Sequence, residues 1–312
     1  MSINKAFLGH GIFTEYSINN ALERFKTYGG GAPATTPAQK IARFVTAMKD
    51  MDIRNVWIQI FTRGQKFDMD APSAQLRKDL IKALGNANIA WAGWGYCGGV
   101  NATRDLTWIK QFKHDLAMQA FVIDAEPEEE NHKDVWTTAD FTTFVTGVNQ
   151  LFGTDNVAMS TWPCVQVREK SVKTLMKIAE PLVCLFAPQV YWMNHPSDPP
   201  HYSTLGYSAA EFPPHDPIAF VRMMIRAWKD AGFTKPLVIS GQAYWTPTSP
   251  SQAKMNEKAE QFARHFADWN QIVGFNWYHA GTGEDSVPEG SMSDAMVNSI
   301  KSAKLGGKPY KM

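Results

Sequence analysis

The stretch Ala120-Phe-Val-Ile-Asp-Ala-Glu-Pro127 combines a buried strand with two carboxylates. Its apolar centre is typical of a strand that is buried on both faces, and Pro127 ends it because proline cannot donate to the ladder. Side chains alternate along a strand, so Asp124 and Glu126 share one face, with their Cα atoms about 6–7 Å apart. At that spacing one negative charge hinders ionisation of the other. The stretch therefore predicts a strand that ends in a pair suited to general acid chemistry.

Segments with strand signals alternate with segments of helical period along the whole chain, and this stretch is the fourth of the strands. The predicted strands are Ala6–Phe13, Asn55–Thr62, Ile89–Tyr96, Ala120–Glu126, Asn156–Trp162, Leu182–Trp192, Pro236–Trp245 and Ile272–His279. The predicted helices are Pro37–Met51, Ser73–Leu84, Thr103–Leu116, Thr138–Phe152, Val167–Ala179, Pro217–Ala231, Gln252–Trp269 and Met292–Ala303. Eight such repeats predict one domain over residues 1–312, an α/β fold of the (β/α)8 TIM-barrel type. An open doubly wound sheet is the alternative, but Gly29–Gly31 follows no strand directly and so lacks the dinucleotide-binding context.

Composition narrows the possible partners. The 312 residues are 44% hydrophobic and 20% charged, with a net charge of +1, which gives no electrostatic case for nucleic acid or an anionic membrane. We expect no membrane insertion, because no apolar run approaches the roughly 20 residues that span a bilayer. The N-terminus lacks the apolar region of a signal peptide, so we expect synthesis in the cytoplasm and non-classical release for any action on the cell wall. Whether the protein has a delivery or immunity partner stays an open question.

The expected C-terminal ends of the strands carry aromatic, amide and hydroxyl side chains beside the acidic pair. Catalytic groups of such barrels come from these ends. Sugars fit this set, because their ring faces stack on aromatic rings while their hydroxyls pair with amides and carboxylates. The alternative is that the aromatic rings only fill the core. The expected substrate-binding residues are His10, Trp94, Trp162, Gln189, Gln242, Tyr244, Asn276 and Trp277.

Two short motifs resemble known families. Asp124-Ala-Glu126 resembles the Asp-x-Glu motif of TIM-barrel glycoside hydrolases acting on N-acetylhexosamine polymers, notably family 25 lysozymes and family 18 chitinases. Ala187-Pro-Gln-Val-Tyr191 is similar to their sixth-strand element, and Trp277 falls where family 18 has a floor tryptophan.

The resemblance implies hydrolysis of an N-acetylhexosamine-containing polysaccharide, with peptidoglycan preferred. It implies that Glu126 is the general acid. Asp124 would stabilise positive charge or orient a 2-acetamido group of the sugar, and Tyr191 would hydrogen-bond the acetamide oxygen. Substrate assistance of this type removes the need for a distant carboxylate. No cofactor is implied.

Two other functions stay open. The segment Phe7-Leu-Gly-His-Gly-Ile12 lacks the acid that family 25 carries on its first strand, which would fit a non-catalytic carbohydrate-binding barrel. A metal-dependent hydrolase is the further alternative, although the histidines lack the paired spacing of a zinc site and Cys97, Cys164 and Cys184 lack metal-ligand spacing. We therefore expect no metal. The histidines considered for that alternative are His10, His195, His201, His215 and His279.

Overall fold

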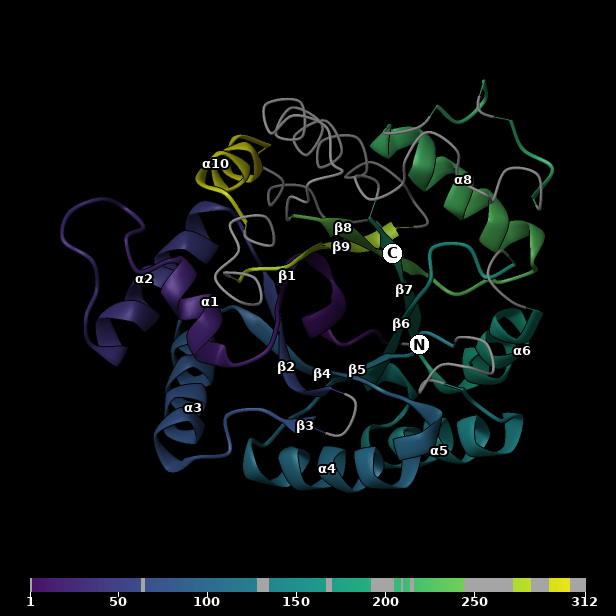
Figure 1. The fold of residues 1–312 in the computed structure, drawn as a ribbon, viewed down its shortest axis with the longest axis horizontal. Helices are drawn as coiled ribbons and strands as arrows, with labels where there is room; N and C mark the ends of the chain where they lie inside the picture. Colours follow the sequence, from purple (N-terminus) through teal and green to yellow (C-terminus); the bar gives the residue numbers. More distant parts are fainter. Residues whose placement is uncertain are drawn as a thin grey trace.

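The protein is described by a computed structural model, in which the described residues are 2–62, 65–127, 135–166, 170–191, 205–208, 210–213, 216–243, 272–281 and 292–303. Parallel strands form a closed barrel, because β1 pairs with both β2 and β9 (Figure 1). The eight strands of the barrel are β1 (Gly9–Thr14), β2 (Asn55–Thr62), β4 (Ala90–Tyr96), β5 (Phe121–Asp124), β6 (Val157–Thr161), β7 (Leu185–Val190), β8 (Leu237–Gln242) and β9 (Ile272–Tyr278). The predicted TIM-barrel fold is confirmed. A two-residue strand, β3 (Gln65–Lys66), extends the end of β2 as an antiparallel hairpin.

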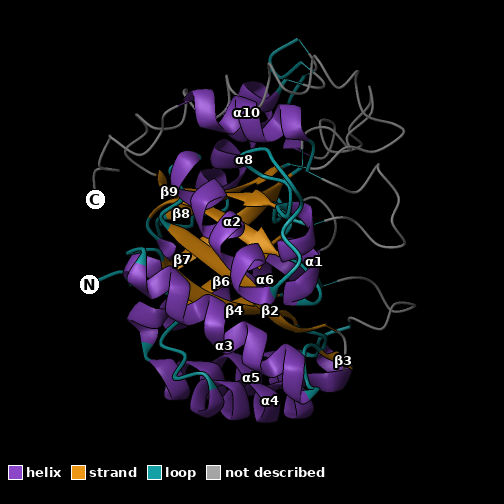
Figure 2. Cartoon of the chain, turned by 90° about the vertical axis from the view of Figure 1, so that its left-hand side faces the viewer, coloured by secondary structure: helices purple, strands orange, loops and turns teal. Residues whose placement is uncertain are grey.

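Helices surround the barrel on its outside (Figure 2). The α-helices of the described residues are α1 (Ile18–Arg24), α2 (Pro37–Asp50), α3 (Ala71–Asn86), α4 (Ala102–Asp115), α5 (Thr138–Phe152), α6 (Lys170–Ala179), α8 (Pro217–Asp230) and α10 (Asp294–Ala303). Short 3-10 helices are η1 (Lys5–Phe7), η2 (Gly99–Asn101), η3 (Thr154–Asn156) and η4 (Glu180–Leu182). Side-chain hydrogen bonds cap the starts of several of the α-helices. The Thr36 side chain, for example, accepts a hydrogen bond from the Gln39 backbone at the start of α2, and the Gln39 side chain completes a capping box.

The predicted and observed elements agree best where the local signal is strong. Strand Asn55–Thr62 and helix Thr138–Phe152 have the predicted bounds, and the remaining described elements differ at their ends. Helix α1 and strand β3 were not predicted. The predicted helix Gln252–Trp269 lies outside the described residues.

Two apolar clusters lie on the two faces of the barrel wall. One fills the lumen and contains Phe13, Trp57, Trp94 and Val122. At its N-terminal end the Trp57 indole donates to the Ala6 carbonyl of η1 at 2.8 Å. Because this cluster fills the lumen from the side of η1, the space for a ligand lies at the C-terminal strand ends.

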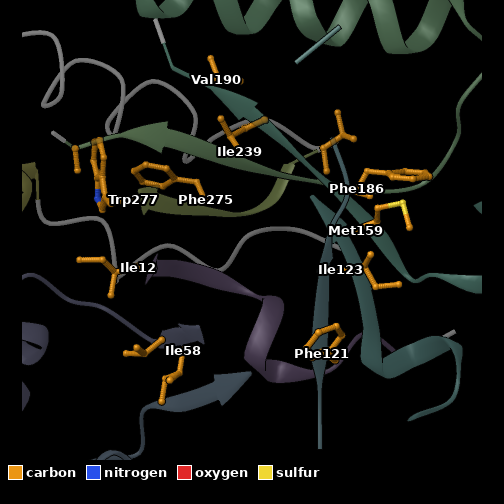
Figure 3. Packing of buried hydrophobic residues seen from close by; sticks show 14 of the residues in the cluster. Ile12, Ile58, Phe121, Ile123, Met159, Phe186, Val190, Ile239, Phe275 and Trp277 are labelled. Carbon is orange, nitrogen blue, oxygen red and sulfur yellow. The ribbon is translucent and has the colours of Figure 1, made fainter. Parts of the chain in front are cut away.

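The second cluster packs between the strands and the helices. Figure 3 shows Ile12, Ile58, Ile123, Phe275 and Trp277 within it. Since side chains alternate along each strand, a residue next in sequence to a member of this cluster points into the lumen. This alternation decides which of the predicted site residues reach the cavity.

Candidate functional site

A cavity of about 390 Å³ lies at the C-terminal ends of the strands. Carboxyl groups, amides and aromatic rings converge on it. Its lining residues are Glu15, Tyr16, Gln59, Thr62, Trp94, Tyr96, Asp124, Glu126, Gln189, Tyr191 and Tyr278. A larger hollow of about 780 Å³ lies outside the barrel between α2 and α3, lined by such residues as Ile41, Val45 and Lys82, and it lacks this convergence. The cavity at the strand ends is therefore the candidate active site.

One amide joins the two predicted catalytic carboxyl groups. Gln189 on β7 places its Nε2 atom 3.0 Å from Asp124 Oδ1 and 2.5 Å from Glu126 Oε1, and it donates to both. The same nitrogen lies 3.3 Å from the Ser160 hydroxyl on β6. Asp124 is the last residue of β5 and pairs in register with Ser160. Three neighbouring strands thus hold the acidic pair in one network, as expected for polar groups at parallel strand ends.

Burial gives Asp124 an unusual proton affinity. Removal from water raises the pKa of Asp124 to about 7, and the negative charge of Glu15 adds to this rise. Hydrogen bonds from Ser160 and Gln189 act in the opposite direction, because they stabilise the ionised carboxylate. Asp124 can therefore carry a proton near neutral pH. Glu126, the proton donor expected from the sequence, is less buried than Asp124.

Glu15 supplies a third carboxyl group, which was not predicted from the sequence. The segment Phe7–Ile12 indeed lacks an acid, but β1 continues to Thr14, and Glu15 follows directly and lines the cavity. Tyr278 donates its hydroxyl to Glu15 Oε1, and His279 Nε2 lies 2.9 Å from Oε2. The first strand itself has no acid, as the sequence indicated, but Glu15 brings a carboxyl group to the cavity from the β1 side, so the missing acid no longer argues for a non-catalytic barrel. The sequence signal that could have identified Glu15 was its position directly after an apolar strand.

The loop that carries Glu15 and Tyr16 is anchored to the hairpin of β2 and β3. The Tyr16 backbone N–H donates to Gln59 Oε1 at 2.5 Å, and the Ser17 hydroxyl donates to Asp68 Oδ1 at 2.5 Å. Asp68 in turn pairs with Arg77 of α3 at 3.0 Å, with side chains 1% and 2% exposed. A buried ion pair with additional hydrogen bonds thus fixes the wall of the cavity on the β1 side.

Aromatic rings form the other walls of the cavity. The rings of Tyr191 and Tyr278 have their centroids 5.2 Å apart at an interplanar angle of 30°. Trp94 is almost completely buried, and its indole N–H donates to the Thr14 carbonyl at 2.9 Å. Trp94 therefore presents only part of its ring to the cavity. The partly exposed rings of Tyr191 and Tyr278 suit the apolar face of a sugar ring.

Trp277 and His10 do not reach this cavity, contrary to the prediction. Trp277 is 0% exposed and belongs to the cluster between strands and helices, where its indole donates to His10 Nε2 at 2.7 Å (Figure 3). The His10 ring stacks on Phe275 with centroids 5.0 Å apart. The physical reason is strand alternation: Tyr278, one residue further along β9, lines the cavity, so Trp277 faces outward.

The remaining predicted binding residues are not among those that line the cavity, or they lie outside the described part of the chain. Gln242 and Asn276 are fully buried and do not line the cavity. Trp162 is partly buried, and its indole N–H points to the Pro127 carbonyl at 3.4 Å. Tyr244 lies outside the described residues. Of the predicted set, the structure brings together Asp124, Glu126, Gln189, Tyr191 and Trp94.

The histidines considered for a metal have other surroundings. Burial lowers the pKa of His10 to about 3, and His279 pairs with Glu15. His195, His201 and His215 lie outside the described residues. Within the described ranges, no group of three or more His, Cys, Asp or Glu side chains could hold a metal ion. A helix long and apolar enough to span a membrane is likewise not found in the described part of the chain.

Comparison of the sequence with protein-family models and with curated proteins finds no match. Among solved structures, the chain is similar to an endo-beta-N-acetylglucosaminidase from Cordyceps militaris, with a TM-score of 0.50, 14% identity and coverage of 96% of this chain and 91% of that chain. It is also similar to the catalytic domain of a mannanase from Streptomyces sp. SirexAA-E (TM-score 0.52, 12% identity, 99% and 91% covered). A psychrophilic beta-glucosidase from Micrococcus antarcticus gives a TM-score of 0.55 at 10% identity, with 98% of each chain covered. At these identities the likeness concerns the barrel fold.

Proposed function

We propose that this chain is a single-domain glycoside hydrolase that cleaves an N-acetylhexosamine-containing polysaccharide, with peptidoglycan as the preferred substrate. The observation that carries the proposal is the Gln189 amide, which joins Asp124 and Glu126 at the wall of a cavity lined by aromatic rings. Paired acids next to aromatic rings suit protonation of a glycosidic oxygen while the sugar ring stacks. The three similar solved structures are named as an endo-beta-N-acetylglucosaminidase, a mannanase and a beta-glucosidase, which supports glycoside hydrolysis as the class of reaction.

Each carboxyl group then has a separate task. Glu126, the less buried of the pair, protonates the glycosidic oxygen as the acetamide oxygen of the substrate attacks the anomeric carbon and the leaving sugar departs. Water then opens this intermediate at the anomeric carbon and gives a proton back to Glu126. Asp124 is buried and its pKa is raised to about 7, so it can carry a proton near neutral pH, and in that form it donates a hydrogen bond that orients the 2-acetamido group. Tyr191 donates to the acetamide oxygen from the wall formed with Tyr278. Gln189 holds both carboxyl groups in their relative positions.

The test compares Glu126→Gln with the wild type on peptidoglycan and on chitin, with released reducing ends as the readout. The amide keeps the shape of the side chain but cannot deliver a proton. General acid assistance is worth about 100-fold to 10,000-fold in rate, so a loss in this range is expected. Isothermal titration with oligosaccharides should show that binding survives the substitution.

Glu180→Gln is the matched control. Glu180 begins η4, which precedes β7 and so lies at the opposite end of the barrel from the cavity. It should keep the wild-type rate. Retention of most of the wild-type activity by Glu126→Gln would refute the assignment of the acid. A wild type that binds glycans but cleaves none would make the non-catalytic barrel the better interpretation.

A further inference from the structure

Glu15 approaches the cavity from a different side than the acidic pair. It follows β1, whereas Asp124 ends β5, and in the closed sheet β2 and β4 lie between these two strands on one side. Both strands end at the same rim, and Glu15, Asp124 and Glu126 line one cavity. A ligand in this cavity thus meets carboxyl groups on two sides.

The side chain of Glu15 is oriented by two donors on the adjacent end of β9. Tyr278 donates to Oε1, and His279 Nε2 lies 2.9 Å from Oε2. Donors at both oxygens stabilise the ionised form and hold the carboxylate in one orientation. This arrangement keeps a negative charge at the cavity wall, where the substrate would lie.

Glu15 can supply a carboxylate next to the anomeric carbon, which the acidic pair, in the roles proposed for it, does not supply. Glycoside hydrolysis passes through an oxocarbenium-like transition state, which requires a proton donor for the leaving oxygen and a negative charge near the anomeric carbon. Glu126 is the proposed donor, and burial raises the pKa of Asp124 to about 7, so Asp124 carries a proton in part of the molecules at neutral pH. Of the three cavity carboxyl groups, Glu15 is then the one that donors at both oxygens, Tyr278 and His279, hold in the ionised form.

We propose that Glu15 is a catalytic carboxylate that stabilises the positive charge at the anomeric carbon from the β1 side of the cavity. Glu126 protonates the departing oxygen, and water then adds to the anomeric carbon and returns a proton to Glu126, so that cleavage does not require a 2-acetamido group on the sugar. This inference rests on the proposed hydrolase function and widens its substrate class. Hexosides with a 2-hydroxyl and hexosides with a 2-acetamido group are both substrates. An enzyme that relied on substrate assistance would cleave only the second kind.

The test uses penta-N-acetylchitopentaose, called chitopentaose below, and cellopentaose, which share the β-1,4 linkage and differ only in the substituent at C2. The wild type should cleave both, with kcat values within about tenfold of each other. Glu15→Ala should lower kcat for both by at least about 100-fold, as the loss of a group that stabilises transition-state charge does. Sodium formate should restore part of the activity of Glu15→Ala, because the small anion occupies the vacated space. Glu15→Gln keeps the side-chain shape, so formate should not restore it.

The outcomes separate this inference from the proposed function. If the wild type cleaves neither pentasaccharide nor peptidoglycan, both proposals fail. If it cleaves peptidoglycan or chitopentaose but not cellopentaose, or if Glu15→Gln keeps the wild-type kcat, only the role of Glu15 fails. Circular dichroism identifies variants that do not fold, and in that case Glu15→Gln, the smaller change, decides the question.

Discussion

His279 Nε2 lies 2.9 Å from Glu15 Oε2, with the two side chains only 5% and 14% exposed. Burial alone would raise the pKa of Glu15. The charge of His279, together with hydrogen bonds from His279, Tyr278 and Tyr16, outweighs burial and holds the pKa of Glu15 below its ordinary value. The end of β9 therefore controls the charge state of a carboxylate that belongs to β1.

Replacing His279 should move the acidic limb of the pH–rate profile. In His279→Gln, burial dominates and the pKa of Glu15 rises, so the ionised form is lost at a higher pH than in the wild type. We expect the acidic limb of the plot of kcat against pH to shift to higher pH. Tyr278→Phe should shift it in the same direction by less. His114→Gln is the control, because His114 is 90% exposed on α4. An unchanged limb in His279→Gln would show that Glu15 does not govern it.

Asp124 should make the folded protein less stable as the pH rises. Its pKa is about 7 in the folded state and about 3.9 in an unfolded chain, so between these values the folded state binds a proton that the unfolded state has released. Stability is therefore lost from about pH 4 to pH 7. Asp124→Asn, which cannot ionise, should match the wild type near pH 4 and exceed it at pH 8, by a few kcal/mol at about 1.4 kcal/mol per pKa unit.

Thermal unfolding at pH 4, 6 and 8 measures this difference. Glu211→Gln is the control for a surface carboxyl group, since Glu211 is 49% exposed. The difference in stability between Glu211→Gln and the wild type should stay small at every pH. A gain for Asp124→Asn that is equal at pH 4 and pH 8 would contradict the raised pKa of Asp124.

The buried pair of Asp68 and Arg77 should matter far more than a surface pair. Arg77→Met leaves the Asp68 carboxylate buried without its partner, at a cost of about 3–5 kcal/mol in the free energy of unfolding. Arg226→Met breaks an exposed pair with Glu211, with side chains 48% and 49% exposed, and should cost less than about 1 kcal/mol. Urea denaturation followed by tryptophan fluorescence gives both values. Equal losses would mean that the pair does not anchor the β1 side of the cavity.

The sequence predicted the elements whose signals are local. Apolar runs marked the strands of the barrel, and apolar spacing marked the helices α2 to α6, α8 and α10. It did not predict α1, because Ile18–Arg24 is too short for a periodic signal and depends on distant partners. The Ile18 backbone N–H donates to the Asp68 carboxylate at 3.0 Å, across fifty positions of sequence. Contacts of that range cannot be read from a local pattern.

The site was predicted in part for a related reason. Asp124 and Gln189 were found because each ends, or nearly ends, a strand that an apolar run marked. Glu15 was missed because the end of β1 depends on pairing with β2, where Thr14 aligns with Ile58. Trp277 was misplaced because the face of a strand depends on register, and a shift of one residue exchanges the two faces. Strand signals therefore predicted which residues lie at the C-terminal ends of the strands more reliably than which face of the strand each side chain occupies.

Trp277 should act on stability and leave ligand binding unchanged. It is 0% exposed between β9 and the helices, packs on Phe275 with ring centroids 4.8 Å apart, and donates to His10. Trp277→Ala removes this packing and should cost about 3–5 kcal/mol in the free energy of unfolding. Trp277→Phe keeps most of the ring and provides a variant that folds if the first does not. Oligosaccharide affinity, measured by isothermal titration, should stay within about twofold of the wild type.

Trp94→Phe is the matched comparison, because Trp94 belongs to the lumen cluster and lines the cavity. It should weaken oligosaccharide binding more than Trp277→Phe does, although both replace a buried indole. The two variants separate the two faces of the barrel wall, since one changes the surface that meets the sugar and the other changes the packing behind it. Weaker binding in Trp277→Phe with an unchanged free energy of unfolding would place Trp277 in the cavity and contradict its assignment to the outer cluster.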